Sequence, residues 1–129
     1  TPANFYESAI TTFRLGNVNA DAYTFNSHYS GNNPTIFVLS GTTVAFDLSQ
    51  IGGHPFAIQD STGTNYNTGL VHVATDGTVS TGSNAQGKSS GTLYWRIQES
   101  LGSPPNYRYQ CTSHVSMVGA ITIKRISSI

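Results

Sequence analysis

Apolar and polar residues alternate along this chain in short bursts, which glycine, asparagine and proline interrupt. Alternation with a period of two places apolar side chains on one face of a β-strand, and no segment has a convincing helical period. The pattern therefore predicts strands at residues 22–25, 35–39, 43–48, 55–58, 70–73, 93–97, 107–111 and 120–126.

About eight short strands separated by turn-forming residues are typical of an all-β fold in which two sheets pack face to face. We expect an antiparallel β-sandwich. In the strands at 43–48 and 93–97 the apolar residues occupy alternate positions, so their side chains, including the single tryptophan Trp95, should enter the core. The polar stretch at 61–90 is predicted to be a long crossover at the edge of the sandwich.

The chain has 129 residues, with six basic and six acidic side chains and no net formal charge. This length is enough for one two-layer core, so residues 1–129 are interpreted as a single domain. The chain lacks the clustered basic residues of a nucleic-acid-binding protein. It also lacks the run of roughly 18 apolar residues that a membrane-spanning helix requires.

The carboxylates are scattered singly along the chain, and none forms a pair of general acid and general base in the sequence. Isolated acidic residues are most often at the surface or in turns. The six are Glu7, Asp21, Asp47, Asp60, Asp76 and Glu99. The chain therefore offers no catalytic constellation and is not predicted to be an enzyme.

One motif near the end of the chain contains three side chains that can bind a metal ion. Cys111, His114 and Met117 follow one another at three-residue steps and include the only cysteine and the only methionine. A cysteine thiolate, two imidazoles and a distant thioether are the ligand set of a blue-copper site. The motif supplies three of these four donors and predicts a copper site that a second imidazole completes.

The second imidazole must come from His28, His54 or His72. His54 follows the pair Gly52–Gly53 and opens an apolar strand, where glycine lets the backbone approach a bound group and the strand provides a rigid base. His28 lies in a polar run, and His72 alternates outward between two valines. We predict that His54 is the ligand, with a surface turn as the alternative, and that His28 and His72 are solvated.

With these residues the chain resembles the cupredoxins, the plastocyanin and azurin group of small blue-copper proteins. The resemblance covers nearly the whole length: an upstream His54, a strand at 107–111 that ends on the cysteine, the ligand loop and a closing strand at 119–123. The Cys-x2-His-x2-Met spacing looks like that of amicyanin. The resemblance implies a Greek-key β-sandwich that holds one copper. The four implied copper ligands are His54, Cys111, His114 and an axial Met117.

The same resemblance implies type 1 copper chemistry, with the protein acting as a one-electron carrier. A redox protein would then dock at the end of the molecule that carries His114 and Val115. The implied location is extracytoplasmic, either periplasmic or secreted. Two alternatives remain open: a copper-binding module of a larger surface or virion structural protein without a redox role, and a copper carrier.

Residues 54–56 are also similar to the His-Pro-x-His-x-His segment of multicopper oxidases. In those enzymes the two later histidines bind an oxygen-reducing copper cluster, and here Ala57 and Gln59 stand in their places. Cluster-binding histidines also flank the cysteine of the oxidases, whereas Gln110 and Thr112 flank it here. The sequence therefore predicts no oxidase activity.

Pro55 departs from the pattern of many cupredoxins, in which an asparagine follows the first histidine ligand and its N–H bonds to the cysteine sulfur. Proline has no N–H to donate. A sulfur with one hydrogen bond fewer donates more electron density and favours Cu(II). We predict that Pro55→Asn raises the reduction potential, measured by voltammetry of the copper-loaded protein. An unchanged or lower potential in a variant that keeps its fold and copper would contradict the missing-bond account.

Overall fold

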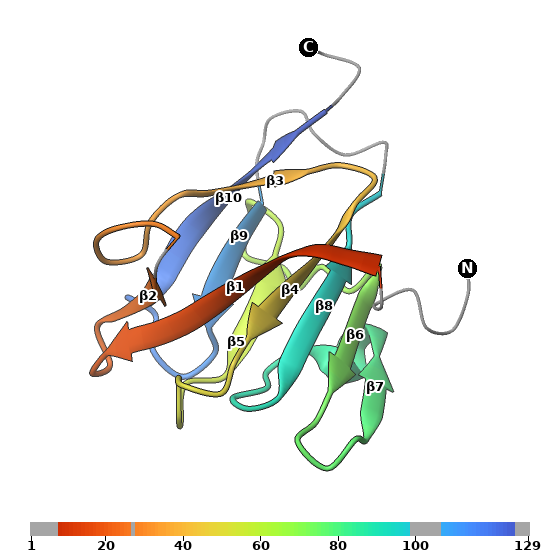
Figure 1. Cartoon of the computed structure of the whole chain (residues 1–129). Helices are drawn as coiled ribbons and strands as arrows, with labels where there is room; N and C mark the ends of the chain where they lie inside the picture. Colours follow the sequence, from red (N-terminus) through yellow and green to blue (C-terminus); the bar gives the residue numbers. More distant parts are fainter. Residues whose placement is uncertain (1–7, 27, 99–106, 126–129) are drawn as a thin grey trace.

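Two β-sheets form a sandwich in the computed structural model, which describes residues 8–26, 28–98 and 107–125. The six-stranded sheet has the order β2 (Ala22–Asn26), β1 (Ala9–Val18), β4 (Thr43–Asp47), β8 (Thr92–Arg96), β6 (Leu70–Val73) and β7 (Val79–Thr81). The four-stranded sheet has the order β3 (Ile36–Leu39), β10 (Val118–Lys124), β9 (Tyr107–Cys111) and β5 (Phe56–Gln59). Figure 1 shows both sheets, and the predicted all-β Greek-key sandwich is confirmed.

The chain changes sheets repeatedly, which makes distant segments neighbours. From β3 to β6 successive strands alternate between the smaller and the larger sheet. As a result β1 pairs in parallel with β4, and β3 pairs in parallel with β10. The prediction of an antiparallel sandwich is wrong for these two pairs, because hydrophobic alternation carries no information about strand direction.

Large apolar side chains from both sheets fill the core. Phe46 and Trp95 from the larger sheet and Tyr109 and Ile121 from the smaller sheet are all fully buried. The side chains predicted to point inward from 43–48 and 93–97 are buried as expected: Val44, Phe46, Leu48, Leu93, Trp95 and Ile97. Burying one large apolar side chain contributes about 1.5–3 kcal/mol, so these side chains contribute strongly to the stability of the sandwich.

Each of the eight predicted strands is present, and the strand ends that the structure describes differ from the predicted ends by at most two residues. Ile126, the predicted end of the last strand, lies outside the described residues. Two further described strands were not predicted. In β1 the register against β4 shifts between Ala9 and Thr11, and Ile10 is 69% exposed. This irregularity breaks the apolar alternation on which the prediction relied. The short edge strand β7 is mostly exposed and has no buried face to mark it.

The polar stretch at 61–90 covers the edge strand β5 as well as crossing between sheets. It contains β6, β7 and a short 3-10 helix, η2 (Gly82–Ala85). The carboxamide of Gln86 accepts a hydrogen bond from the N–H of Ile58 at 2.9 Å and donates to the carbonyl of Ile58 at 2.8 Å. The N–H of Phe56 donates to the carbonyl of Lys88 at 2.8 Å. These bonds satisfy backbone groups that an open sheet edge would expose.

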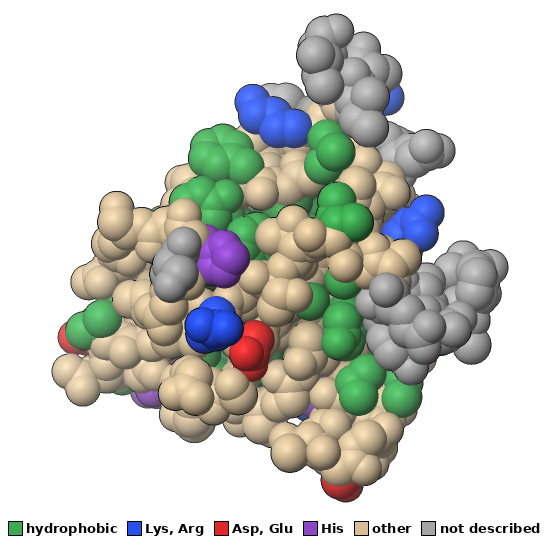
Figure 2. Space-filling model, viewed as in Figure 1, with side chains coloured by type: hydrophobic (Ala, Val, Ile, Leu, Met, Phe, Trp, Pro, Cys, Tyr) green, Lys and Arg blue, Asp and Glu red, His purple; other side chains and the backbone are tan. Residues whose placement is uncertain are grey.

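Charged side chains are sparse on the face drawn in Figure 2, where most of the surface is polar and uncharged. Large exposed apolar side chains among the described residues are Ile10, Val18, Phe37, Val79 and Val115. Within the described ranges, the structure contains no helix with the length and apolar character needed to cross a membrane.

Candidate metal centre

The pairing of β5 with β9 brings together the two chain segments that carry the predicted ligands. Phe56, the first residue of β5, lies opposite Cys111, the last residue of β9. His54 comes two residues before this pair, and the carbonyl of Pro55 accepts a hydrogen bond from the N–H of Thr112 at 2.9 Å. The segment with His54 and the loop that begins at Cys111 are therefore fastened side by side at one end of the smaller sheet.

A tight turn precedes His54. Gly53 has a φ of 76°, in the left-handed region that favours glycine. A Cβ atom added at Gly52 or Gly53 would meet no other atom within 4 Å. The backbone turn therefore favours glycine at position 53. The sequence-based explanation, that glycine lets the backbone approach a bound group, is not supported by the open space around these two residues.

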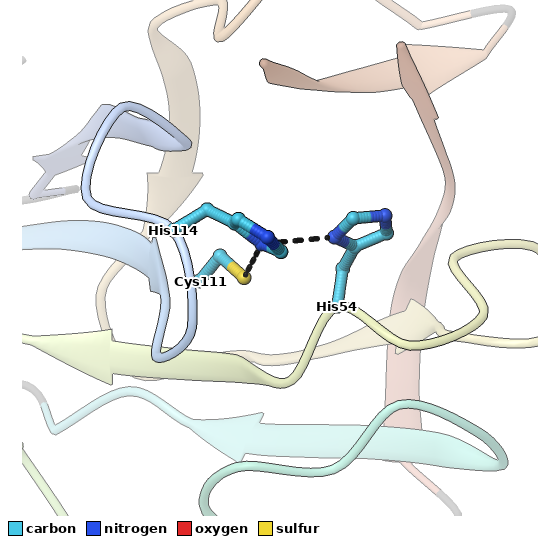
Figure 3. Close-up of side chains that lie close together, drawn as sticks. All are labelled: His54, Cys111 and His114. Atoms are coloured by element: carbon cyan, nitrogen blue, oxygen red, sulfur yellow. Dashed lines mark hydrogen bonds between the residues drawn. The ribbon is translucent and has the colours of Figure 1, made fainter. Parts of the chain in front are cut away.

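Residues 111–117 form a short closed loop. The N–H of Cys111 donates to the carbonyl of Met117 at 2.9 Å, and the N–H of Met117 donates to the carbonyl of His114 at 3.1 Å. The two ends of the loop are therefore adjacent. Figure 3 shows the result: the His114 ring lies between the Cys111 sulfur and the His54 ring.

Three ligating atoms converge at this point. Nδ1 of His54 lies 3.3 Å from Nδ1 of His114, which lies 3.6 Å from Sγ of Cys111, and all three atoms are within 4.8 Å of one another. Around a tetrahedral ion with bonds of about 2.05 Å to nitrogen and about 2.3 Å to sulfur, two nitrogens lie about 3.3 Å apart and a nitrogen and a sulfur about 3.6 Å apart. The two separations that involve His114 therefore match those around a bound metal ion, and the third lies within 4.8 Å.

The centre has a buried inner side and an exposed outer side. Met117 is fully buried and belongs to the same apolar cluster as Cys111, which is 2% exposed. His54 and His114 are half-buried, and Val115 is 88% exposed. The predicted exposure of Val115 is confirmed, whereas the role of Met117 as a ligand stays a prediction.

Two polar side chains that no sequence motif marks hold the ligand-bearing segments. The buried hydroxyl of Tyr23 donates to the carbonyl of His54 at 2.6 Å. Burial, and after it the neighbouring Cys111, raise the pKa of Tyr23 well above its usual range, so the hydroxyl keeps its proton. The Asn33 side chain accepts the N–H of Tyr23 at 2.9 Å and donates to the carbonyl of Ser116 at 3.1 Å. These contacts join residues far apart in sequence, which local patterns do not reveal.

Neither of the other two histidines belongs to the converging group. His28 is exposed, as predicted, and its ring lies edge-on to that of Phe13 with centroids 5.3 Å apart. His72 is 3% exposed, so the prediction that it is solvated is wrong. Its Nε2 lies 2.6 Å from the carbonyl oxygen of Ser90, and η2 packs against β6. In β6, His72 lies opposite Leu93 of β8, and Leu70 lies opposite Trp95, so His72 shares a face with core residues. Its side chain therefore points inward, and the predicted outward alternation is wrong.

Three of the acidic side chains in the described part of the chain stabilise turns. Asp47, Asp60 and Asp76 each accept a hydrogen bond from the backbone N–H two residues ahead, at 2.9 to 3.0 Å. The expectation that isolated carboxylates stabilise turns is confirmed for these three. Glu7 and Glu99 lie outside the described residues.

We predict that Tyr23→Phe weakens Cu(II) binding roughly tenfold, because it removes the hydroxyl that holds His54 while keeping the aromatic ring. Affinity is measured by competition with a chelator. Tyr109→Phe is the matched control, since Tyr109 is equally buried and its hydroxyl donates to the carbonyl of Pro34 at the same 2.6 Å. Equal losses of affinity in both variants would show that the Tyr23 hydroxyl has no specific role.

No protein-family model and no curated protein matches the chain. Among solved structures it is similar to a reduced Cu(I) form of an amicyanin mutant at pH 4, with 15% identity, 88% of this chain and 81% of that chain covered, and a TM-score of 0.43. An oxidized amicyanin mutant is 13% identical, with 87% and 81% covered and a TM-score of 0.45. The Cu(I) form of another amicyanin mutant is 16% identical, with 93% and 89% covered and a TM-score of 0.44. The two-sheet sandwich and the meeting of His54, Cys111 and His114 at one end of it confirm the resemblance to the cupredoxins that the motif implied.

Proposed function

We propose that the protein is a type 1 copper protein that binds one copper ion and acts as a one-electron carrier. The single observation that carries this proposal is the convergence of one sulfur and two imidazole nitrogens within 4.8 Å. Such a set, with a thioether nearby in the chain, suits copper in both of its oxidation states. The proposed ligands are His54, Cys111 and His114, with Met117 as a weak axial ligand.

Copper bound at this centre would alternate between Cu(I) and Cu(II) and so carry one electron. The proposed ligands, a thiolate, two imidazoles and a thioether, would suit both states. Cys111 loses its proton to bind as a thiolate, and the apolar cluster that contains Cys111 and Met117 keeps water from the inner side. Backbone hydrogen bonds of 2.9 Å, from Cys111 to Met117 and from Thr112 to Pro55, restrain the loop. Electron transfer would therefore require little rearrangement of the chain.

The outer side of the centre is the proposed docking site for a redox protein. His114 is half-buried and leads from the buried Cys111 to the surface, where Val115 is 88% exposed. Only 9% of the residues are charged, so docking here would depend more on apolar contact than on long-range electrostatic steering. An extracytoplasmic location, periplasmic or secreted, is part of the same proposal.

The copper-loaded protein should show an intense visible band from charge transfer between thiolate and copper, and a reversible one-electron wave in voltammetry. Cys111→Ser should abolish the band, because the chain has no other thiolate. Ser113→Ala, at an exposed position of the same loop, is the control and should keep band and wave. Metal analysis distinguishes copper from zinc, which accepts similar donors. A band that persists in Cys111→Ser would contradict the copper assignment, and a band without a reversible wave would favour the module without a redox role.

Met117→Gln should lower the reduction potential, because an amide oxygen is a harder donor than a thioether and stabilises Cu(II) relative to Cu(I). The potential is measured by voltammetry of the copper-loaded variant. Met117→Leu, which offers no donor, is the control and should not lower the potential. An unchanged or raised potential in Met117→Gln would indicate that this side chain does not face the metal.

A further inference from the structure

The side chain of Gln110, next to Cys111 in the sequence, lies inside the ligand loop. Gln110 is 7% exposed. Its Nε2 lies 2.9 Å from the carbonyl oxygen of Cys111, and 3.1 Å from those of both His114 and Met117. The carbonyl oxygen of Val115 follows at 3.4 Å. The backbone carbonyls of the loop therefore turn inward around one amide nitrogen.

Hydrogen-bond chemistry determines which way this carboxamide faces. All four neighbours are acceptors, so only the NH2 group can bond to them. Its two hydrogens are shared among the four oxygens, with the 3.4 Å contact the weakest. If the amide were turned the other way, its own oxygen would face carbonyl oxygens with no hydrogen between them. The surrounding loop thus requires a donor at this point.

We propose that Gln110 is a positioning residue of the metal centre, whose carboxamide sets the conformation of the loop from Cys111 to Met117 before any metal binds. A carbonyl oxygen has two lone pairs, and backbone N–H groups already bond to one on His114 and one on Met117. Gln110 supplies a second donor to these two carbonyls and a donor to the carbonyl of Cys111, and losing it would leave buried acceptors less well satisfied. With Gln110 in place, His114 and Cys111 already face each other. The inference rests on the proposed function only in taking copper as the ion that this loop receives.

The sheet gives Gln110 a fixed base. In β9 it lies opposite Ala57 of β5 on one side and Val118 of β10 on the other. Because both neighbours hold its backbone, the carboxamide is positioned by the sheet and in turn positions the loop. The strands therefore fix the Gln110 amide, and the amide fixes the loop that carries the proposed ligands. The loop can adopt this conformation without a bound ion.

The test compares Gln110→Met with Gln59→Met. Methionine fills similar space without an N–H donor. Gln59 is 8% exposed and its side chain bonds to Asn65 and Arg108, away from the loop, which makes it a matched control. In the metal-free protein, Gln110→Met should speed hydrogen exchange of the loop amides at Met117 and Val118 by roughly tenfold or more, whereas Gln59→Met should change it less than about twofold. Equal exchange in both variants would overturn the proposal.

Copper binding provides the second readout. Gln110→Met should weaken Cu(II) affinity roughly 10- to 100-fold, the usual effect of losing a group that orients metal ligands, while Gln59→Met should leave it nearly unchanged. Equal affinities in the two variants would overturn the link between Gln110 and the ligands. If the wild-type protein itself showed no thiolate-to-copper band, the proposed function would fail, and the exchange measurement, made without metal, would still decide the role of Gln110.

A measurement on the wild-type protein decides the case if Gln110→Met does not fold. The side-chain NH2 protons of Gln110 in the metal-free protein should exchange with solvent at least roughly tenfold more slowly than those of the exposed Gln50, because they are held by the loop carbonyls. Nuclear magnetic resonance resolves the two side chains. Exchange as fast as that of Gln50 would show that the amide does not hold the loop and would overturn the proposal.

Discussion

The candidate centre depends on the hydrogen-bonded register between β5 and β9. Because Phe56 lies opposite Cys111, the segment that carries His54 emerges beside the loop that carries His114. Neighbouring residues of a strand point to opposite faces, so a shift of one residue in this pairing would exchange the faces and separate the sulfur from the imidazoles. The central position of β9, between β5 and β10, protects that register.

Three polar side chains hold the segments that strand pairing brings together. Tyr23, Asn33 and Gln110 each donate hydrogen bonds to backbone carbonyls of the segments that carry the candidate ligands. Some of these carbonyls also accept one backbone N–H, but each has two lone pairs, and in a buried setting an undersatisfied carbonyl is unfavourable. The same low polarity strengthens the bonds that are made. Sheet pairing therefore brings the segments together, and side-chain donors define their shapes.

The candidate centre is buried on one side and exposed on the other. Cys111 and Met117 adjoin the apolar core, where water is excluded and neighbouring side chains are closely packed. His114 is half-buried and Val115 is exposed, so the other side of the centre meets the surface. The candidate ligands next to the core and the residues that reach the surface are thus different residues of one short loop.

The sequence by itself determined most strand positions and the candidate ligands, because both follow from local spacing. Alternation revealed the inward residues of β4 and β8, and three-residue steps placed Cys111, His114 and Met117 in one loop. Tertiary structure alone decided the parallel pairs, the irregular β1, the burial of His72 and the roles of Tyr23 and Gln110. These depend on which distant segments become neighbours, and that is set by strand register and crossovers, for which a local pattern contains no signal.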